Sequence, residues 1–85
     1  MKNVRVFILK SCPYCKAALR WLEELRKEDA RYAALPVEII DENEQKALAD
    51  SLDYYLVPTI YVGDKKVHEG AATKDKIRRA LDAAL

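Results

Sequence analysis

The sequence predicts an α/β protein with a four-stranded mixed sheet flanked by helices, in the element order βαβαββα. Short apolar runs suited to buried strands alternate with stretches whose apolar residues recur at helical spacing. A strand-helix-strand unit followed by a hairpin and a closing helix implies a mixed sheet with helices on both faces. The chain has 85 residues, two glycines and no low-complexity tract, so nothing marks a domain boundary. We expect one domain over residues 1–85.

The first half of the chain supplies two strand-helix pairs. Residues 4–9 form a nearly continuous apolar run, typical of a strand covered on both faces. An amphipathic helix is predicted to begin at the cysteines, with an apolar face made of Ala18, Leu19, Leu22 and Leu25. Residues 37–40 are the second predicted strand, and Asp41 suits the N-cap of the next helix. That second helix is predicted to carry Ala47, Leu48 and Leu52.

A hairpin and a last helix complete the predicted sheet. Residues 59–62 and 65–68 are the predicted strands, and Gly63-Asp64 marks the turn between them. Thr73 suits the N-cap of the closing helix. One face of that helix carries Ile77, Ala80, Leu81 and Ala84.

Composition and charge exclude several classes of function. The formal net charge is +1, with 15 basic residues dispersed among 14 acidic ones, so no basic stripe is available to neutralise a phosphate backbone. The apolar stretch after Met1 is too short to span a membrane and lacks a signal-peptide cleavage pattern. We therefore expect a cytoplasmic protein with neither nucleic acid nor membrane as a partner.

The two cysteines, Cys12 and Cys15, are separated by two residues. In a reducing compartment such a pair is more often catalytic, redox-sensing or metal-binding than a permanent disulfide. A structural zinc site needs four ligands, and only His68 is left to join the cysteines. We expect no metal, and a zinc ion shared between two chains stays a minor alternative.

The position of Cys12 predicts its chemistry. It falls where the first strand ends and the first helix begins, and Pro13 suits the first helical position. Free backbone N–H groups and the positive end of the helix dipole stabilise a thiolate there, and Lys10 and Lys16 are expected to add to this effect. Cys15 lies one turn into the helix, where it is more shielded from solvent. Cys12 is therefore predicted to attack disulfides and Cys15 to resolve the mixed disulfide.

The sequence resembles the glutaredoxins over nearly its whole length. The resemblance is carried by the CPYC motif at residues 12–15, after a short N-terminal strand, and by Val57-Pro58. It implies the thioredoxin fold, a cis Pro58 beside the cysteines, and a Val57 backbone that pairs with the incoming disulfide as a short antiparallel strand. It also implies that Pro13 and an exposed Tyr14 contribute to the substrate groove.

The sequence also departs from the glutaredoxin pattern. Leu9 stands where the family usually has a lysine, and Tyr55 and Leu56 stand where it often has a basic residue and a threonine. These family positions help to hold the glycine carboxylate of glutathione. We expect Lys10 or Gln45 to meet that carboxylate instead.

The C-terminal part is closer to the thioredoxins. The family's Gly-Gly-x-Asp element, which holds the γ-glutamyl end of glutathione, is replaced at residues 69–75 by Glu-Gly-Ala-Ala-Thr-Lys-Asp. Pro58-Thr59 and Gly70-Ala71 are also typical of thioredoxins. We still place Gly70 at the substrate site.

These features together predict a thiol-disulfide oxidoreductase that reduces protein disulfides and mixed disulfides with glutathione. We expect a monomer without a tightly bound cofactor, with glutathione as co-substrate and disulfide-containing or glutathionylated proteins as partners. One alternative is a thioredoxin-like electron donor regenerated by thioredoxin reductase. A remoter one is a glutathione-bridged iron-sulfur dimer held through Cys12, which the neighbouring Pro13 disfavours by family resemblance.

Four aromatic side chains have weaker interpretations. Trp21 lies off the apolar face of the first helix and is expected to pack against a neighbouring element. His68 is expected to be an ordinary surface residue in a short strand. Tyr54 and Tyr55 either shape the substrate groove or cap the core.

Overall fold

The structure is a computed structural model that describes all residues from 1 to 85. Its strands form one sheet in the order β2-β1-β3-β4, in which β1 runs parallel to β2 and antiparallel to β3. The predicted four-stranded mixed sheet is therefore confirmed. The elements are β1 (Val4–Ile8), α1 (Pro13–Glu28), α2 (Ala30–Ala33), β2 (Val37–Asp41), α3 (Lys46–Asp50), β3 (Thr59–Val62), β4 (Lys65–Glu69) and α4 (Lys74–Asp82).

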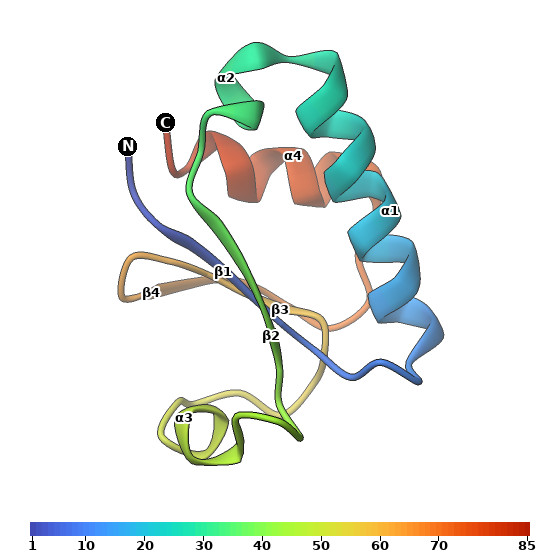
Figure 1. The fold of residues 1–85 in the computed structure, drawn as a ribbon, viewed down its shortest axis with the longest axis vertical. Coiled ribbons are helices and arrows are strands. Elements are labelled where there is room, and N and C mark those ends of the chain that lie inside the picture. The colour runs from blue at the N-terminus through green and yellow to red at the C-terminus, as the bar shows by residue number, and fades with distance from the viewer.

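Helices cover both faces of the sheet. Helices α1 and α4 lie together on one side, and α3 lies apart from them beyond the other side (Figure 1). The larger core cluster joins Val4, Val6 and Ile8 of β1 to the inner faces of α1 and α4. A smaller cluster on the opposite face is built on Phe7 and packs against Leu48 of α3. Strand β1 therefore buries side chains on both faces, as its continuous apolar run predicts.

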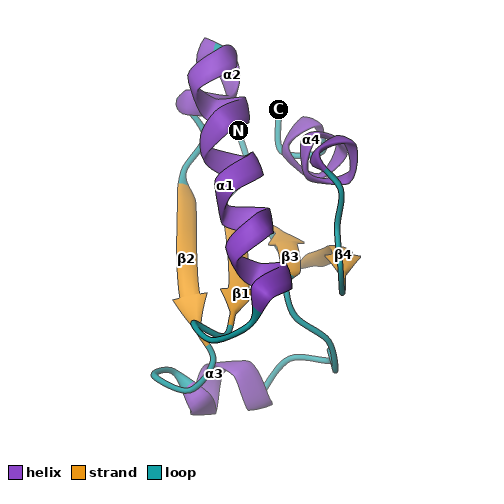
Figure 2. Cartoon of the chain, turned by 90° about the vertical axis from the view of Figure 1, so that its right-hand side faces the viewer, coloured by secondary structure: helices purple, strands orange, loops and turns teal.

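Helix α1 begins and packs as the sequence predicts. Pro13 occupies its first turn, and Cys15, Ala18, Leu22 and Leu25 are buried. Figure 2 shows α1 crossing in front of the sheet, with its first turn near the end of β1. The helix stops at Glu28, and the backbone N–H of Asp29 closes the last turn by donating to the carbonyl of Leu25.

The short helix α2 was not predicted from the sequence. Asp29 serves as its N-cap and accepts a hydrogen bond from the backbone N–H of Arg31 at 2.8 Å. Tyr32 is buried and donates its hydroxyl to the Asp82 carboxylate at 2.5 Å. Because α2 has only four residues, it is too short to show helical periodicity in the sequence.

The predicted N-cap at Asp41 is wrong. Asp41 is the last residue of β2, and its carboxylate accepts hydrogen bonds from the N–H groups of Asn43 at 2.8 Å and Glu44 at 3.3 Å. It therefore stabilises a turn, because short acidic side chains hydrogen-bond to the backbone two or three residues further along. Helix α3 starts only at Lys46, and Leu52 lies beyond its end although it still packs against the smaller core cluster.

The C-terminal hairpin and last helix follow the prediction closely. Gly63 has a φ of 59°, the left-handed conformation that the turn between β3 and β4 requires. Strand β4 extends to Glu69, one residue beyond its predicted end. The hydroxyl of Thr73 caps α4 by accepting from the N–H of Lys76 at 3.2 Å.

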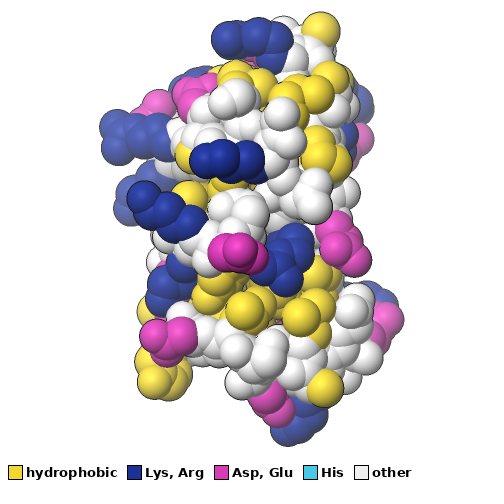
Figure 3. All heavy atoms as spheres, turned by 90° about the vertical axis from the view of Figure 1, so that its left-hand side faces the viewer, with side chains coloured by type: hydrophobic (Ala, Val, Ile, Leu, Met, Phe, Trp, Pro, Cys, Tyr) yellow, Lys and Arg dark blue, Asp and Glu magenta, His cyan; other side chains and the backbone are white.

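Charges of both signs share the surface. On the face drawn in Figure 3, Asp and Glu side chains lie among the Lys and Arg side chains, with hydrophobic groups between them. No helix is both long enough and apolar enough to cross a membrane.

Candidate active site

The predicted site residues lie in the segments next to the ends of the four strands and meet at one end of the sheet. Strand β1 leads into Cys12 at this end, and the parallel strand β2 leads toward Gln45. The antiparallel strand β3 begins there, directly after Val57-Pro58. Strand β4 runs antiparallel to β3 and therefore also ends there, next to Gly70. The topology thus brings four distant segments of the chain to one place.

Cys12 is the N-cap residue of α1. It has extended φ and ψ angles of −84° and 119°, and its side chain is partly exposed. The backbone N–H of Cys15 contributes most to lowering the pKa of Cys12, the Cys15 thiol and the N–H of Tyr14 add to it, and partial burial opposes it. Free N–H groups at a helix start therefore favour the thiolate, as the sequence predicts.

The predicted contribution of lysines to this pKa is not found. Lys10 forms an ion pair with Glu44 at 2.8 Å, and the groups that lower the pKa of Cys12 are backbone N–H donors and the second thiol. The donors at the helix start, which the sequence also predicts, therefore lower this pKa without the expected addition from Lys10 and Lys16.

Cys15 lies in a different environment, one turn into α1. Its side chain is only 1% exposed, and the backbone N–H of Leu9 donates to its sulfur at 3.5 Å. Burial is the main cause that raises the pKa of Cys15 to about 11. Both cysteines are free thiols. One thiol is therefore accessible and readily ionised, and its neighbour is shielded and protonated.

The segment before β3 forms the other side of the site. The Val57-Pro58 peptide bond is cis, in agreement with the family resemblance. The backbone N–H of Gly70 donates to the carbonyl of Pro58 at 2.9 Å. Gly70 has a φ of 90°, and a Cβ atom there would lie 3.4 Å from Leu56 Cδ1. Gly70 therefore fits closely against the proline segment.

Glu69 is a site residue that the sequence analysis missed. Its carboxylate accepts hydrogen bonds from the backbone N–H groups of Tyr55 at 2.6 Å and Leu56 at 3.0 Å, and from Lys66 Nζ at 2.7 Å. The bond from Lys66 is the largest of the causes that lower the pKa of Glu69 to about 2. The only sequence signal was an acidic residue at the end of a strand, directly before a glycine.

The two residues expected to meet glutathione's glycine carboxylate are differently placed. Lys10 is exposed, and its ammonium group pairs with Glu44. Gln45 is the N-cap residue of α3, not part of the helix, and its exposed side chain makes no capping hydrogen bond. Both lie at the site end of the sheet, but only Gln45 is free of a protein partner.

Three large apolar side chains are exposed around the site. Tyr14 is 62% exposed between the cysteines, and Tyr55 and Leu56 are 89% and 61% exposed before Val57. We call these three residues the apolar rim. Tyr55 therefore does not cap the core, one of the two interpretations left open by the sequence, and its place in a substrate groove stays a prediction.

The remaining aromatic residues have structural roles. Tyr54 packs on Phe7 and donates its hydroxyl to Glu42 at 2.7 Å, so it caps the smaller core cluster. Trp21 packs against the larger core cluster, as expected. His68 is not an ordinary surface residue, because it is half-buried and its Nε2 lies 2.7 Å from the Gly70 carbonyl.

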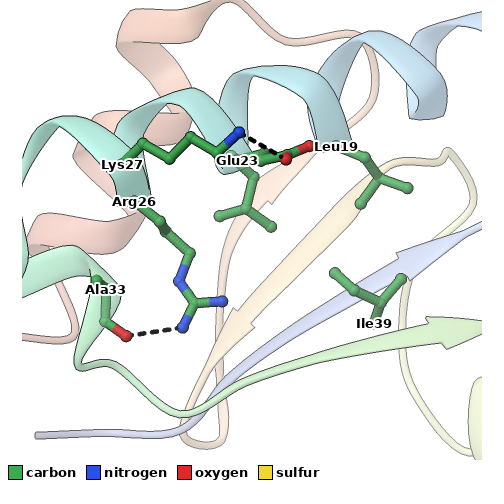
Figure 4. Close-up of a pocket in the computed structure, with 7 residues that line it drawn as sticks. Leu19, Glu23, Arg26, Lys27, Ala33 and Ile39 are labelled. Atoms are coloured by element: carbon green, nitrogen blue, oxygen red, sulfur yellow. Dashed lines mark hydrogen bonds and ion pairs between the residues drawn. The ribbon is translucent and has the colours of Figure 1, made fainter.

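The largest cavity lies away from the cysteines. It has a volume of about 390 Å³ and lies between α1 and β2, with Leu19 and Ile39 facing each other across it (Figure 4). Arg26 closes one end by donating to the carbonyl of Ala33 at 2.9 Å. Neither cysteine lines this cavity. No three His, Cys, Asp or Glu side chains come together in a way that suits a metal ion.

The fold and the cysteine pair together define a thiol-redox protein of the thioredoxin superfamily. A model of the glutaredoxin family, described as "Glutaredoxin", matches residues 4–67. The chain is also 34% identical to a thioredoxin of Methanocaldococcus jannaschii over 85 residues, which covers 98% of this chain and 95% of that protein. The chain belongs to the glutaredoxin family.

Solved structures show the same fold at lower sequence identity. A structure described as that of a malarial protein has a TM-score of 0.74 at 16% identity, covering 98% of this chain and 96% of the other. Thioredoxin 1 from Thermosipho africanus has a TM-score of 0.59 at 22% identity, covering 96% and 97%. These likenesses support the thioredoxin fold.

Proposed function

We propose that the protein is a dithiol reductase of protein disulfides and of mixed disulfides with glutathione. The observation that carries the proposal is the placement of two free thiols at the start of α1: Cys12 is partly exposed at the N-cap and Cys15 is buried one turn further on. Their pKa shifts, downward at Cys12 and upward at Cys15, agree with this placement. A thiolate is the nucleophile in disulfide exchange, so attack falls to Cys12.

The proposed reaction proceeds by two exchanges. The Cys12 thiolate attacks one sulfur of the substrate disulfide, a Cys12–substrate bond forms, and the released substrate thiolate takes up a proton. Cys15 then gives up its proton and attacks the Cys12 sulfur. The Cys12–Cys15 disulfide forms, the second substrate thiol leaves, and two electrons have passed from the protein to the substrate.

The Val57 backbone is the proposed docking group for the substrate. It directly precedes the cis Pro58, at the end of the sheet where β1 leads to Cys12. An extended substrate segment would pair with it by adding a short strand. The apolar rim would contact the substrate's side chains on either side of the disulfide.

Glutathione is the electron donor that we propose, with Gln45 and Lys10 as groups for its carboxylate. Two thiolates of glutathione would reduce the Cys12–Cys15 disulfide in turn and leave as oxidised glutathione. We also propose that the protein acts as a monomer, without a tightly bound cofactor, in the cytoplasm, where the dithiol would be kept reduced.

A second candidate donor is thioredoxin reductase. Two observations favour it: the relative described as a thioredoxin, and the ion pair that occupies Lys10. Following NADPH oxidation on a glutathionylated substrate, with either glutathione plus its reductase or thioredoxin reductase alone, separates the two donors. Turnover with thioredoxin reductase and none at millimolar glutathione would reject glutathione as the donor.

Trapping tests the reductase activity itself. Cys15→Ser should accumulate a mixed disulfide between Cys12 and a disulfide-containing protein, detectable as a mass increase that dithiothreitol reverses. Cys12→Ser is the matched control and should trap nothing. Equal trapping by both variants would contradict the assigned roles.

A further inference from the structure

Glu69 connects the end of β4 to the segment that precedes the cis-proline. It is the last residue of β4 and lies opposite Thr59, the first residue of β3. One oxygen of its carboxylate accepts from the N–H groups of both Tyr55 and Leu56, and the other accepts from Lys66 Nζ. The side chain is only 22% exposed.

The other contacts of this segment hold different atoms. The hydroxyl of Thr59 donates to the carbonyl of Leu56, and the N–H of Gly70 donates to the carbonyl of Pro58. Glu69 alone holds the N–H groups of Tyr55 and Leu56. Without its carboxylate, the two residues before Val57 would lose their only N–H acceptor.

The bonds to Glu69 are of the strong, charge-assisted kind. Its lowered pKa keeps the carboxylate ionised throughout the pH range in which thiols react. Hydrogen bonds to an ionised acceptor are about twice as strong as those between neutral groups. Lys66 orients the carboxylate and also donates to the carbonyl of Asp53 at 2.9 Å, which ties the start of the same segment to β4.

We propose that Glu69 is a positioning residue that holds the Tyr55–Val57 backbone in the conformation that pairs with an extended peptide carrying the substrate disulfide. This inference rests on the proposed function. A segment held in its binding conformation binds a partner more tightly, because less conformational freedom is lost on association. Glu69 therefore acts on substrate affinity.

Glu69 should affect the binding of the substrate peptide and not the chemistry of the Cys12 thiolate. The groups that lower the pKa of Cys12 belong to α1, and Glu69 contacts none of them. Removing its carboxylate should weaken peptide binding and leave the reactivity of the thiolate unchanged. A general loss of folding would instead alter both.

The test is single-turnover oxidation of the reduced protein by a synthetic peptide with a leucine-flanked disulfide, followed by acid quench and mass spectrometry. No electron donor is needed. The variants are Glu69→Leu, which removes both acceptors, and Glu69→Gln, which keeps one acceptor without the charge. Glu38→Gln is the matched control, because Glu38 is exposed on β2 and makes no side-chain hydrogen bond. Alkylation against pH reports the Cys12 pKa in each variant.

For Glu69→Leu we expect the half-saturating peptide concentration to rise about tenfold, with the maximal rate and the Cys12 pKa unchanged. Glu69→Gln should give about a threefold rise, and Glu38→Gln none. If Glu69→Leu does not fold, Glu69→Gln supplies the test through two measurements. Its half-saturating peptide concentration should rise about threefold, and hydrogen exchange at its Tyr55 and Leu56 amides should be faster.

An unchanged half-saturating concentration, or an equal rise in Glu38→Gln, would overturn the inference. Failure of the wild-type protein to react with the peptide would instead reject the proposed function.

Discussion

The two sides of the active site are built in different ways. The thiol side is local: Cys12, Cys15 and the backbone N–H groups that lower the pKa of Cys12 all lie at the start of α1. The proline side is assembled from distant parts of the chain, since Glu69 at the end of β4 holds the segment before Pro58 and the next residue, Gly70, donates to the carbonyl of Pro58. The thiol environment is thus encoded in a short motif, whereas the proposed docking segment depends on the tertiary fold.

The largest expected effect concerns the thiol side. Cys12→Ser should abolish all disulfide reduction, because the accessible, readily ionised thiol is lost. Cys15→Ser should abolish turnover on protein disulfides and retain reduction of glutathionylated substrates, where a second glutathione can release the product. Steady-state assays on both substrate types check this. Full activity of Cys12→Ser would reverse the roles of the two thiols.

The next effect tests the proline side. Gly70→Ala should lower the free energy of unfolding by about 1–3 kcal/mol, because a side chain is strained at a φ of 90°. Gly63→Ala is the comparison, because the φ of Gly63 is 59°, within the left-handed region that other residues enter at lower cost, and no atom lies within 4 Å of its Cβ position. Urea unfolding of both variants measures the difference. A smaller loss in Gly70→Ala than in Gly63→Ala would contradict the expected backbone strain at Gly70.

A smaller effect comes from the helix that follows Gly70. Thr73→Ala should destabilise the protein by about 1 kcal/mol, because the Thr73 hydroxyl caps α4. Thr73→Ser keeps the cap and should remain within a few tenths of a kcal/mol of the wild type. Thermal unfolding distinguishes them, and equal losses in the two variants would show that the cap contributes little.

The smallest effect concerns Lys10. Glu44→Gln removes its ion-pair partner, and the KM for glutathione should then fall by about twofold, because exposed ion pairs are weak and release little. Kinetics with glutathione and glutathione reductase measure this. No change, or a rise in KM, would exclude Lys10 as a group that meets the glutathione carboxylate.

The contrast between the local thiol side and the proline side also explains which features could be predicted from the sequence. The order of the strands and of helices α1, α3 and α4 followed from local patterns, and so did the N-cap at Thr73 and the greater burial of Cys15 relative to Cys12. The role of Glu69 was missed because its partners at Tyr55 and Leu56 lie 14 and 13 residues away in the sequence and are backbone groups.

Two other predictions from the sequence, at Asp41 and at Lys10, were wrong. Asp41 was assigned to a helix because an N-cap and a turn use the same carboxylate-to-backbone hydrogen bond. The contribution of Lys10 to the pKa of Cys12 was predicted because the two residues are close in the sequence. Closeness in the sequence does not show which group a long side chain contacts, and Lys10 forms an ion pair with Glu44. Such choices depend on tertiary contacts that the sequence does not display.

The rate of alkylation of each cysteine as a function of pH tests the central claim most directly. Iodoacetamide labelling of the reduced protein, with peptide mass spectrometry to separate the sites, gives one titration curve for Cys12 and one for Cys15. The Cys12 rate should rise with pH through a midpoint below the ordinary thiol value of about 8.5, because its lowered pKa leaves the thiolate present above that midpoint. Cys15 should react slowly, with a midpoint near 11. Coincident curves, or a lower midpoint for Cys15, would contradict the account.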